Sequence, residues 1–216
     1  MQYPKERKQV LAAVQEISKT GLVTGTWGNA SAKCQGTDMF IITPSGMNYD
    51  TLSIEDMVLV DGNNQVVEGN FKPSVEVPMH VGIYNSRPEV QAIVHTHSTY
   101  AKAFAVARKS LPIILDELAQ VIGHEVPTAK YAVAGTDALA DNVIAALGND
   151  KKAVFMAHHG LITLGSSMAD ALKKAHVIER ACQVYIYAQL LGGSYSLSEK
   201  DISVLNENFK HYGQKK

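Results

Sequence analysis

The sequence predicts an α/β fold in which a central, largely antiparallel β-sheet is flanked by helices. Two observations support this prediction: apolar strand-like segments alternate irregularly with amphipathic helical segments, and a hairpin turn occurs in the first half of the chain. The 216 residues contain no repeat, linker or low-complexity segment. A chain of this length suits one sizeable core, so we expect a single domain over residues 1–216.

The first half of the chain begins with a helix and continues with strands. Residues 4–19 carry apolar side chains at helical spacing, and Gly21 ends the helix. Residues 38–43 and 56–61 are predicted strands. The turn over 61–64 then returns the chain as a strand over 65–68.

A second helix is predicted to open near Ser74, which is a good N-cap residue. Pro78 is tolerated in a first helical turn, and Glu76 falls in that turn, where the helix dipole favours a carboxylate. The alternative for Glu76 is an ordinary surface residue. We interpret His80, one turn further on, as a packing or supporting histidine.

The second half alternates buried strands with capped helices. Its predicted strands are 90–94, ending at His95, and 153–157, which 161–164 continues. Its predicted helices, each following a Ser or Thr N-cap, run from Ser98 to about Arg108, over 137–147 after Thr136, from Ser167 to Leu191, and from Ser198 through Phe209.

His95 and His97 form the strongest chemical signal. Residues two apart in extended backbone share a face, with Cα atoms about 6.5–7 Å apart. Both rings can then reach one metal ion at about 2.0–2.1 Å. Adjacent His158 and His159 would point to opposite faces of a strand, so one of them can join the pair. The alternative is a pair of hydrogen-bonding histidines at a strand end.

Two glycine- and hydroxyl-rich segments could bind an anion. Residues 24–31 combine Thr26, Gly28 and Asn29 with further small polar residues, and Ser45 and Gly46 follow a strand. Backbone N–H groups in such loops form anion-binding concavities. A plain turn is the alternative, and the residues of the first segment alone favour it.

The composition excludes several partners. A net charge of −1 suggests neither nucleic acid nor an anionic membrane as a partner. The two cysteines lack metal-type spacing, and the N-terminal residues are too polar for a secretory signal. We expect a cytoplasmic protein.

Taken together, five motifs resemble those of the class II (zinc-dependent) aldolase and adducin-head family, of the L-fuculose-phosphate aldolase type. They are Gly25–Ser31, Thr43–Gly46, Lys72–Glu76, His95–His97 and His158–Leu161, and they occur in family order over nearly the whole chain. The resemblance implies a three-layer fold with nine strands. It also implies a homotetramer with active sites at subunit interfaces.

The resemblance also assigns roles. It implies that His95, His97 and His159 bind Zn²⁺, that Glu76 is a fourth ligand and the proton-transfer base, and that Tyr212 assists at the active site. Thr26, Gly28, Asn29, Ser45, Gly46 and Ser74 match the loops that bind the substrate phosphate. Mn²⁺ or Co²⁺ could replace Zn²⁺. The expected reaction is cleavage or formation of a C–C bond in a ketose phosphate through a metal-bound enediolate.

Three departures from the family pattern leave the substrate open. Val75 replaces a second serine, Asp116 aligns with a tyrosine of the neighbouring subunit, and Ala134 aligns with an aromatic residue. Other reactions in the family are decarboxylation of a 3-oxo-tetronate phosphate and 4-epimerisation of a pentulose phosphate. The epimerase pattern has Asp where Glu76 stands. A non-catalytic adducin-like module is disfavoured because all four expected metal ligands are present.

Overall fold

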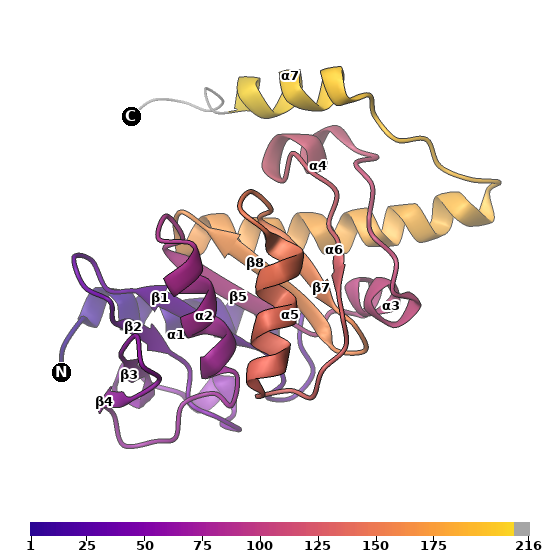
Figure 1. Cartoon of the computed structure of the whole chain (residues 1–216). Helices are drawn as coiled ribbons and strands as arrows, with labels where there is room; N and C mark the ends of the chain where they lie inside the picture. The colour runs from indigo at the N-terminus through magenta and orange to yellow at the C-terminus, as the bar shows by residue number, and fades with distance from the viewer. Residues whose placement is uncertain (210–216) are drawn as a thin grey trace.

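In a computed structural model that describes residues 1–209, eight strands form one sheet in the order β4-β3-β2-β1-β5-β8-β7-β6 (Figure 1). The strands are β1 (Asn29–Lys33), β2 (Phe40–Ile42), β3 (Val58–Val60), β4 (Val66–Glu68), β5 (Ala92–Thr96), β6 (Thr128–Ala129), β7 (Ala153–Met156) and β8 (Gly160–Gly165). Only β6 and β7 pair in parallel. The predicted antiparallel sheet is confirmed, with eight strands in the described residues rather than nine.

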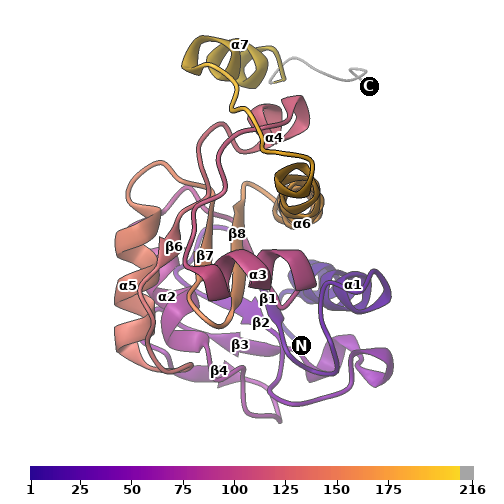
Figure 2. The same ribbon diagram turned by 90° about the vertical axis from the view of Figure 1, so that its right-hand side faces the viewer.

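Helices cover both faces of this sheet, which makes three layers (Figure 2). They are α1 (Pro4–Lys19), α2 (Val77–Ser86), α3 (Thr99–Ala107), α4 (Asp116–Val121), α5 (Asp137–Leu147), α6 (Met168–Leu190) and α7 (Glu199–Phe209), with short 3₁₀ helices at Tyr49–Thr51 and Ile54–Asp56. Helices α2 and α5 pack on one face, while α1, α3 and α6 pack on the other. Among residues 1–209, no helix combines the length and apolar character needed to cross a membrane.

Side-chain alternation along the central strands builds the two cores. In β5, Ile93 packs into the core beneath α2 and α5, whereas Ala92 and Val94 pack toward α1 and α6. His95 shares the face of Ile93 because the strand repeats every two residues. This alternation points His95 toward the start of α2.

Several predicted helix starts are confirmed in detail. The first helix runs over Pro4–Lys19, as expected. The Thr136 side chain accepts a hydrogen bond from the Leu139 N–H, and the Ser167 side chain accepts one from the Asp170 N–H. The predicted 61–64 turn also forms, and it brings β4 back beside β3.

Residues 161–164 do not continue the strand that precedes them, so that prediction is wrong. The chain reverses over residues 157–159, and β8 returns antiparallel to β7. His158 makes the reversal with φ 58°, a left-handed conformation that non-glycine residues adopt only occasionally. Alternation along one strand therefore does not apply to His158 and His159.

Ser74 is not the N-cap of the second helix. Helix α2 begins at Val77 with Glu76 as its N-cap, while Ser74 Oγ accepts a hydrogen bond from the Glu76 N–H at 3.3 Å. The Ser74 N–H is already bonded to the Thr43 carbonyl oxygen, which keeps Ser74 in the neighbouring loop. The short strand β6 and helix α4 are not among the predicted elements, and β5 ends at Thr96, one residue beyond the predicted end at His95.

Candidate metal centre and its pocket

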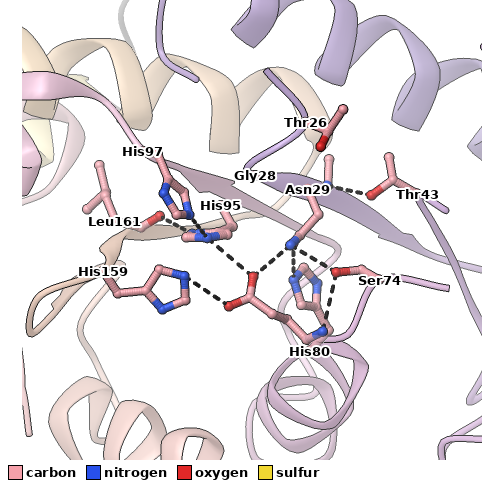
Figure 3. Close-up of polar contacts among 12 residues, drawn as sticks. Thr26, Gly28, Asn29, Thr43, Ser74, His80, His95, His97, His159 and Leu161 are labelled. Atoms are coloured by element: carbon pink, nitrogen blue, oxygen red, sulfur yellow. Dashed lines mark hydrogen bonds and ion pairs between the residues drawn. The ribbon is translucent and has the colours of Figure 1, made fainter. Parts of the chain in front are cut away.

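Three histidine rings converge at one point near the C-terminal end of β5 (Figure 3). His95, His97 and His159 each offer a ring nitrogen, and these atoms all lie within 4.8 Å of one another. The Nε2 atoms of His95 and His97 are 2.8 Å apart. The same-face prediction for His95 and His97 is confirmed, and of the two downstream histidines it is His159 that joins them.

The sheet register explains how residues so distant in sequence meet. Strand β8 pairs with β5, with Thr96 opposite Leu161, so the turn before β8 lies beside the end of β5. Gly160 makes this close approach possible, because a Cβ there would overlap the Thr96 carbonyl oxygen and lie 2.9 Å from His95 Cε1. The turn thereby places the His159 ring beside those of His95 and His97.

Helix α6 fixes the segment that follows His97. The Glu179 carboxylate accepts hydrogen bonds from Ser98 Oγ at 2.6 Å, from the Tyr100 N–H at 3.0 Å and from the Ala101 N–H at 2.8 Å. These are groups at the N-terminus of α3, which the Ser98 side chain itself does not cap. An acid from another helix thus takes the capping role.

The nitrogen atoms at the centre are suited to a cation. His95 Nδ1 lies 3.1 Å from the Leu161 carbonyl oxygen, which can only accept, so Nδ1 carries the proton and Nε2 presents a lone pair. Burial lowers the pKa of both His95 and His97, with smaller contributions from neighbouring histidines, so both rings are neutral at pH 7. Neutral imidazole nitrogens that converge in this way are typical zinc ligands.

Glu76 faces the same point from the start of α2. Its Oε2 atom lies 3.2 Å from His95 Nε2, and its Oε1 atom lies 3.3 Å from His159 Nε2. Within residues 1–209, nothing hydrogen-bonds the buried Oε1 atom. Burial raises the pKa of Glu76, while His159 and the hydrogen bond from Asn29 oppose that rise. The carboxylate is therefore more basic than an exposed glutamate.

A cavity of about 280 Å³ opens over the histidines and Glu76. Its lining contains every predicted site residue that the structure describes, together with four others: Thr26, Trp27, Gly28, Asn29, Pro44, Ser45, Gly46, Ser74, Val75, Glu76, His95, His97, Ala134 and His159. Larger cavities of about 460 and 640 Å³ lie elsewhere and contain none of the three histidines. The predicted loops and the predicted metal ligands thus share one pocket.

Backbone and side-chain hydrogen bonds hold the loops at this pocket. The Ser45 N–H donates to the Lys72 carbonyl oxygen, and Asn29 Nδ2 donates to Ser74 Oγ at 3.1 Å. Tyr49 Oη donates to the carbonyl oxygen of Thr26 or Gly28. Gly28 has φ 126°, and a Cβ there would lie 2.9 Å from the His95 carbonyl oxygen. The first loop can therefore approach β5 only through a glycine.

Trp27 is a pocket residue that sequence reasoning did not select. Trp27 is 65% exposed, and its ring stacks near His97, with ring centroids 6.4 Å apart. Its place between Gly25 and Gly28, in a predicted anion-binding segment, was the available signal.

Some predicted residues lie away from the cluster. His158 contacts Arg108, with Nε2 3.1 Å from Nη2, and its ring meets the Tyr131 ring edge-on. Asp116 is exposed at the first position of α4 and does not line the pocket. Tyr212 lies outside the described residues.

Comparison with known proteins identifies the family. The model of the class II aldolase and adducin N-terminal domain family matches residues 8–186. L-fuculose phosphate aldolase of Escherichia coli K12 is 36% identical over 214 residues, which cover 99% of this chain and 98% of that protein. The 5-deoxy-D-ribulose 1-phosphate aldolase of Bacillus thuringiensis serovar kurstaki is 35% identical over 210 residues, covering 97% of this chain and 98% of the relative.

The fold comparison agrees. A solved structure of an L-fuculose 1-phosphate aldolase has a TM-score of 0.93 and 31% identity, covering 97% of this chain and 98% of its own. The chain therefore belongs to the class II aldolase and adducin N-terminal domain family and is a lyase of the class II aldolase type.

Proposed function

We propose that this aldolase cleaves and forms a C–C bond of a ketose 1-phosphate with the help of one divalent ion, preferably Zn²⁺. The observation that carries the proposal is the convergence of His95, His97 and His159 beside the buried Glu76 carboxylate, within a single pocket. The names of the two relatives at 35–36% identity also specify sugar phosphates.

The residues present fit a zinc ion. Three imidazole ligands leave further coordination positions free, and Glu76 Oε1 is a buried acceptor without a hydrogen-bond donor in residues 1–209. When bound, such an ion supplies Lewis-acid stabilisation of the negative charge that develops on substrate oxygens as the C–C bond breaks. We assign His95, His97 and His159 as ligands, with Glu76 as a fourth ligand when no substrate is present.

Glu76 is also the proposed proton-transfer base. Its carboxylate is buried and more basic than usual, and it faces the space above the histidines. A carboxylate in this position takes or returns the proton at the carbon that acts as nucleophile in aldol addition. Asn29, which donates to Glu76 Oε2 at 2.7 Å, holds that carboxylate in place.

The three loops are proposed to bind the phosphate. Thr26, Gly28 and Asn29 come from the first loop, Ser45 and Gly46 from the second, and Ser74 from the third. Hydroxyl and backbone N–H donors recognise phosphate without needing an arginine.

Two further proposals rest on the family resemblance. Tyr212 protonates the aldehyde oxygen in the condensation direction, which suits a phenol that is protonated at neutral pH. The chain, a single domain over residues 1–216, acts as a cytoplasmic homotetramer with active sites between subunits.

A metal-replete substrate screen tests the proposal. L-fuculose 1-phosphate, 5-deoxy-D-ribulose 1-phosphate, the two free sugars and a 3-oxo-tetronate phosphate are compared, with triose phosphate and CO₂ measured separately. We expect triose phosphate from a ketose 1-phosphate, loss of that activity with a chelator, and recovery with Zn²⁺. Release of CO₂ alone, or equal rates with and without the chelator, would refute the proposal.

The variant Glu76→Gln distinguishes a role of Glu76 as proton-transfer base from a role as metal ligand alone. We expect it to retain metal but to lose about 10²–10⁴-fold in turnover, the usual cost of removing a general base. Metal content and turnover are measured on the same preparation. Near-normal turnover with metal bound would restrict Glu76 to coordination.

A further inference from the structure

Behind the pocket, a chain of buried polar side chains runs away from Glu76. Asn29 Nδ2 lies 2.7 Å from Glu76 Oε2, and Asn29 Oδ1 lies 2.7 Å from His80 Nε2 (Figure 3). His80 Nδ1 lies 2.7 Å from Ser31 Oγ, which in turn lies 2.8 Å from Tyr84 Oη. Neither His80, Ser31 nor Tyr84 lines the pocket.

The helix and the strand have matching repeats, which explains why these residues meet. Glu76, the N-cap of α2, and His80 and Tyr84 within α2 are spaced by four residues and therefore share one face, about 6 Å apart in rise. Asn29 and Ser31 are spaced by two along β1 and also share one face, about 6.6 Å apart. The helix residues and the strand residues consequently alternate along one line.

Only one direction of donation satisfies every hydrogen bond in the series from Glu76 to Tyr84. As a metal ligand Glu76 is ionised and only accepts, so the Asn29 NH₂ group must face it and the Asn29 oxygen must face His80. His80 Nε2 then carries the proton and donates. His80 Nδ1 accepts from the Ser31 hydroxyl, whose oxygen accepts from Tyr84 Oη.

Burial removes the alternatives to this arrangement. His80 and Ser31 are fully buried, Asn29 is 4% exposed and Tyr84 is 5% exposed, so bulk water cannot replace a lost partner. Burial also lowers the pKa of His80 to about 3, and the ring stays neutral with one proton at neutral pH. A buried polar group left without its partner would be costly.

We propose that His80 is a positioning residue which fixes the orientation of the Asn29 carboxamide and, through it, aims the Glu76 carboxylate at the three histidines. Glu76, through Asn29, sets the tautomer of His80, and the Ser31 and Tyr84 hydroxyls supply the matching hydrogen bond at Nδ1. The inference rests on the proposed function, because Glu76 and Asn29 have their roles only in that proposal.

Loss of His80 would release Asn29. Without a donor to its oxygen, the Asn29 carboxamide can flip by 180° and place that oxygen next to Glu76. The 2.7 Å hydrogen bond from Asn29 Nδ2 to Glu76 Oε2 is then replaced by repulsion between two oxygen atoms. Residues that orient a metal-site group in this way typically contribute about 10- to 100-fold to activity or metal affinity.

The test combines kinetics with a direct measurement of the tautomer. In the zinc-loaded full-length protein labelled with ¹⁵N-histidine, the His80 ring nitrogens are assigned by comparison with His80→Gln. We expect His80 Nε2 to be protonated and Nδ1 to be unprotonated. The opposite tautomer would overturn the proposal whatever the enzyme activity.

The kinetic arm uses paired variants. We expect His80→Met to lower kcat/KM by about 10- to 100-fold, and His80→Gln, which keeps a donor near the Nε2 position, to restore most of it. Ile83→Val is the control. It shortens a buried side chain of the same helix that takes no part in the hydrogen bonds between Glu76 and Tyr84, so activity should be unchanged.

A double-mutant cycle separates positioning from simple loosening. In an Asn29→Ala background, His80→Met should cause no further loss of kcat/KM, because its effect passes through Asn29. If Asn29→Ala is strongly impaired and His80→Met still adds its full loss, this inference fails while the proposed function stands. If Asn29→Ala is as active as the wild type, Asn29 has no role in the proposed site and the inference fails with that assignment.

Discussion

The variant Gly160→Ala should weaken metal binding more than its small size suggests. The new Cβ would overlap the Thr96 carbonyl oxygen and lie 2.9 Å from His95 Cε1. Carbon and oxygen atoms at rest are about 3.4 Å apart or more, so the backbone between His95 and His97 must retreat by roughly 1 Å. A functional constellation tolerates errors of only about 0.5 Å.

The magnitude has two parts. Overpacking of this kind costs about 1–3 kcal/mol in folding free energy. At this chain length each kcal/mol lowers Tm by about 2–4 °C. Displacement of His95 and His97 should in addition weaken Zn²⁺ affinity by at least about tenfold, as changes to groups that orient metal ligands do.

Competition with a fluorescent chelator gives the affinity, and thermal unfolding of the metal-free protein gives the stability. Gly165→Ala is the matched control: its Cβ would overlap the Ser167 carbonyl oxygen and lie 2.9 Å from Ala171 Cβ, at the far end of β8. Gly165→Ala should lower Tm but leave the metal affinity unchanged. In Gly62→Ala the nearest contact would be 3.5 Å away, so neither quantity should change. Wild-type zinc affinity in Gly160→Ala would refute the reasoning.

Three further predictions follow from the described contacts. His159→Ala should lose bound metal, as measured by elemental analysis, whereas His158→Ala should retain it, because His158 contacts Arg108 instead; equal losses would contradict this assignment. The metal-free protein should lose stability as the pH falls from about 6.5 toward about 3, because burial lowers the pKa of His80 to about 3 and the unfolded chain takes up the proton first. Denaturant titrations across that range should show a flatter dependence for His80→Gln, and an unchanged slope would exclude His80 as the source. Val75→Ser should lower KM for the sugar phosphate several-fold, since a hydrogen bond to a charged group is worth about 1.5–3 kcal/mol; an equal gain for the free sugar would show that Val75 does not face the phosphate.

Local rules predicted much of the fold. Thr136, Ser167 and Ser198 were recognised as helix starts because capping depends on residues within one turn. The His95–His97 pairing also followed from the two-residue repeat of a strand. In each case the deciding contact lies within a few residues along the chain.

The failures come from contacts that are distant in sequence or from unusual backbone. His158 adopts a left-handed conformation that favours glycine, so the strand alternation rule gave the wrong geometry for 158–164. The cap of α3 is Glu179, which is 78 residues beyond Ala101 and looks like any charged residue on a long helix. Ser74 was misplaced for the same reason, because Thr43 in a different loop binds its N–H.

The order of strands has a consequence for folding kinetics. The proposed metal ligands come together through pairings between distant segments: Asn29 lies opposite His95, and Thr96 opposite Leu161. Local hairpins such as β7–β8 close quickly. The pairings of β5 with β1 and with β8 each join residues at least 60 apart in the sequence, and such long-range closure is slow.

A metal ion would therefore find the complete set of proposed ligands only after these slow pairings have formed. An ion that binds the native state alone stabilises it by about 2.7 kcal/mol at a concentration of 100 times Kd. We expect the proposed ligands to meet after the folding transition state, in which case this stabilisation acts by slowing unfolding. Metal supply should thus set the lifetime of the folded enzyme, whereas the rate at which newly made chains fold should be almost independent of it.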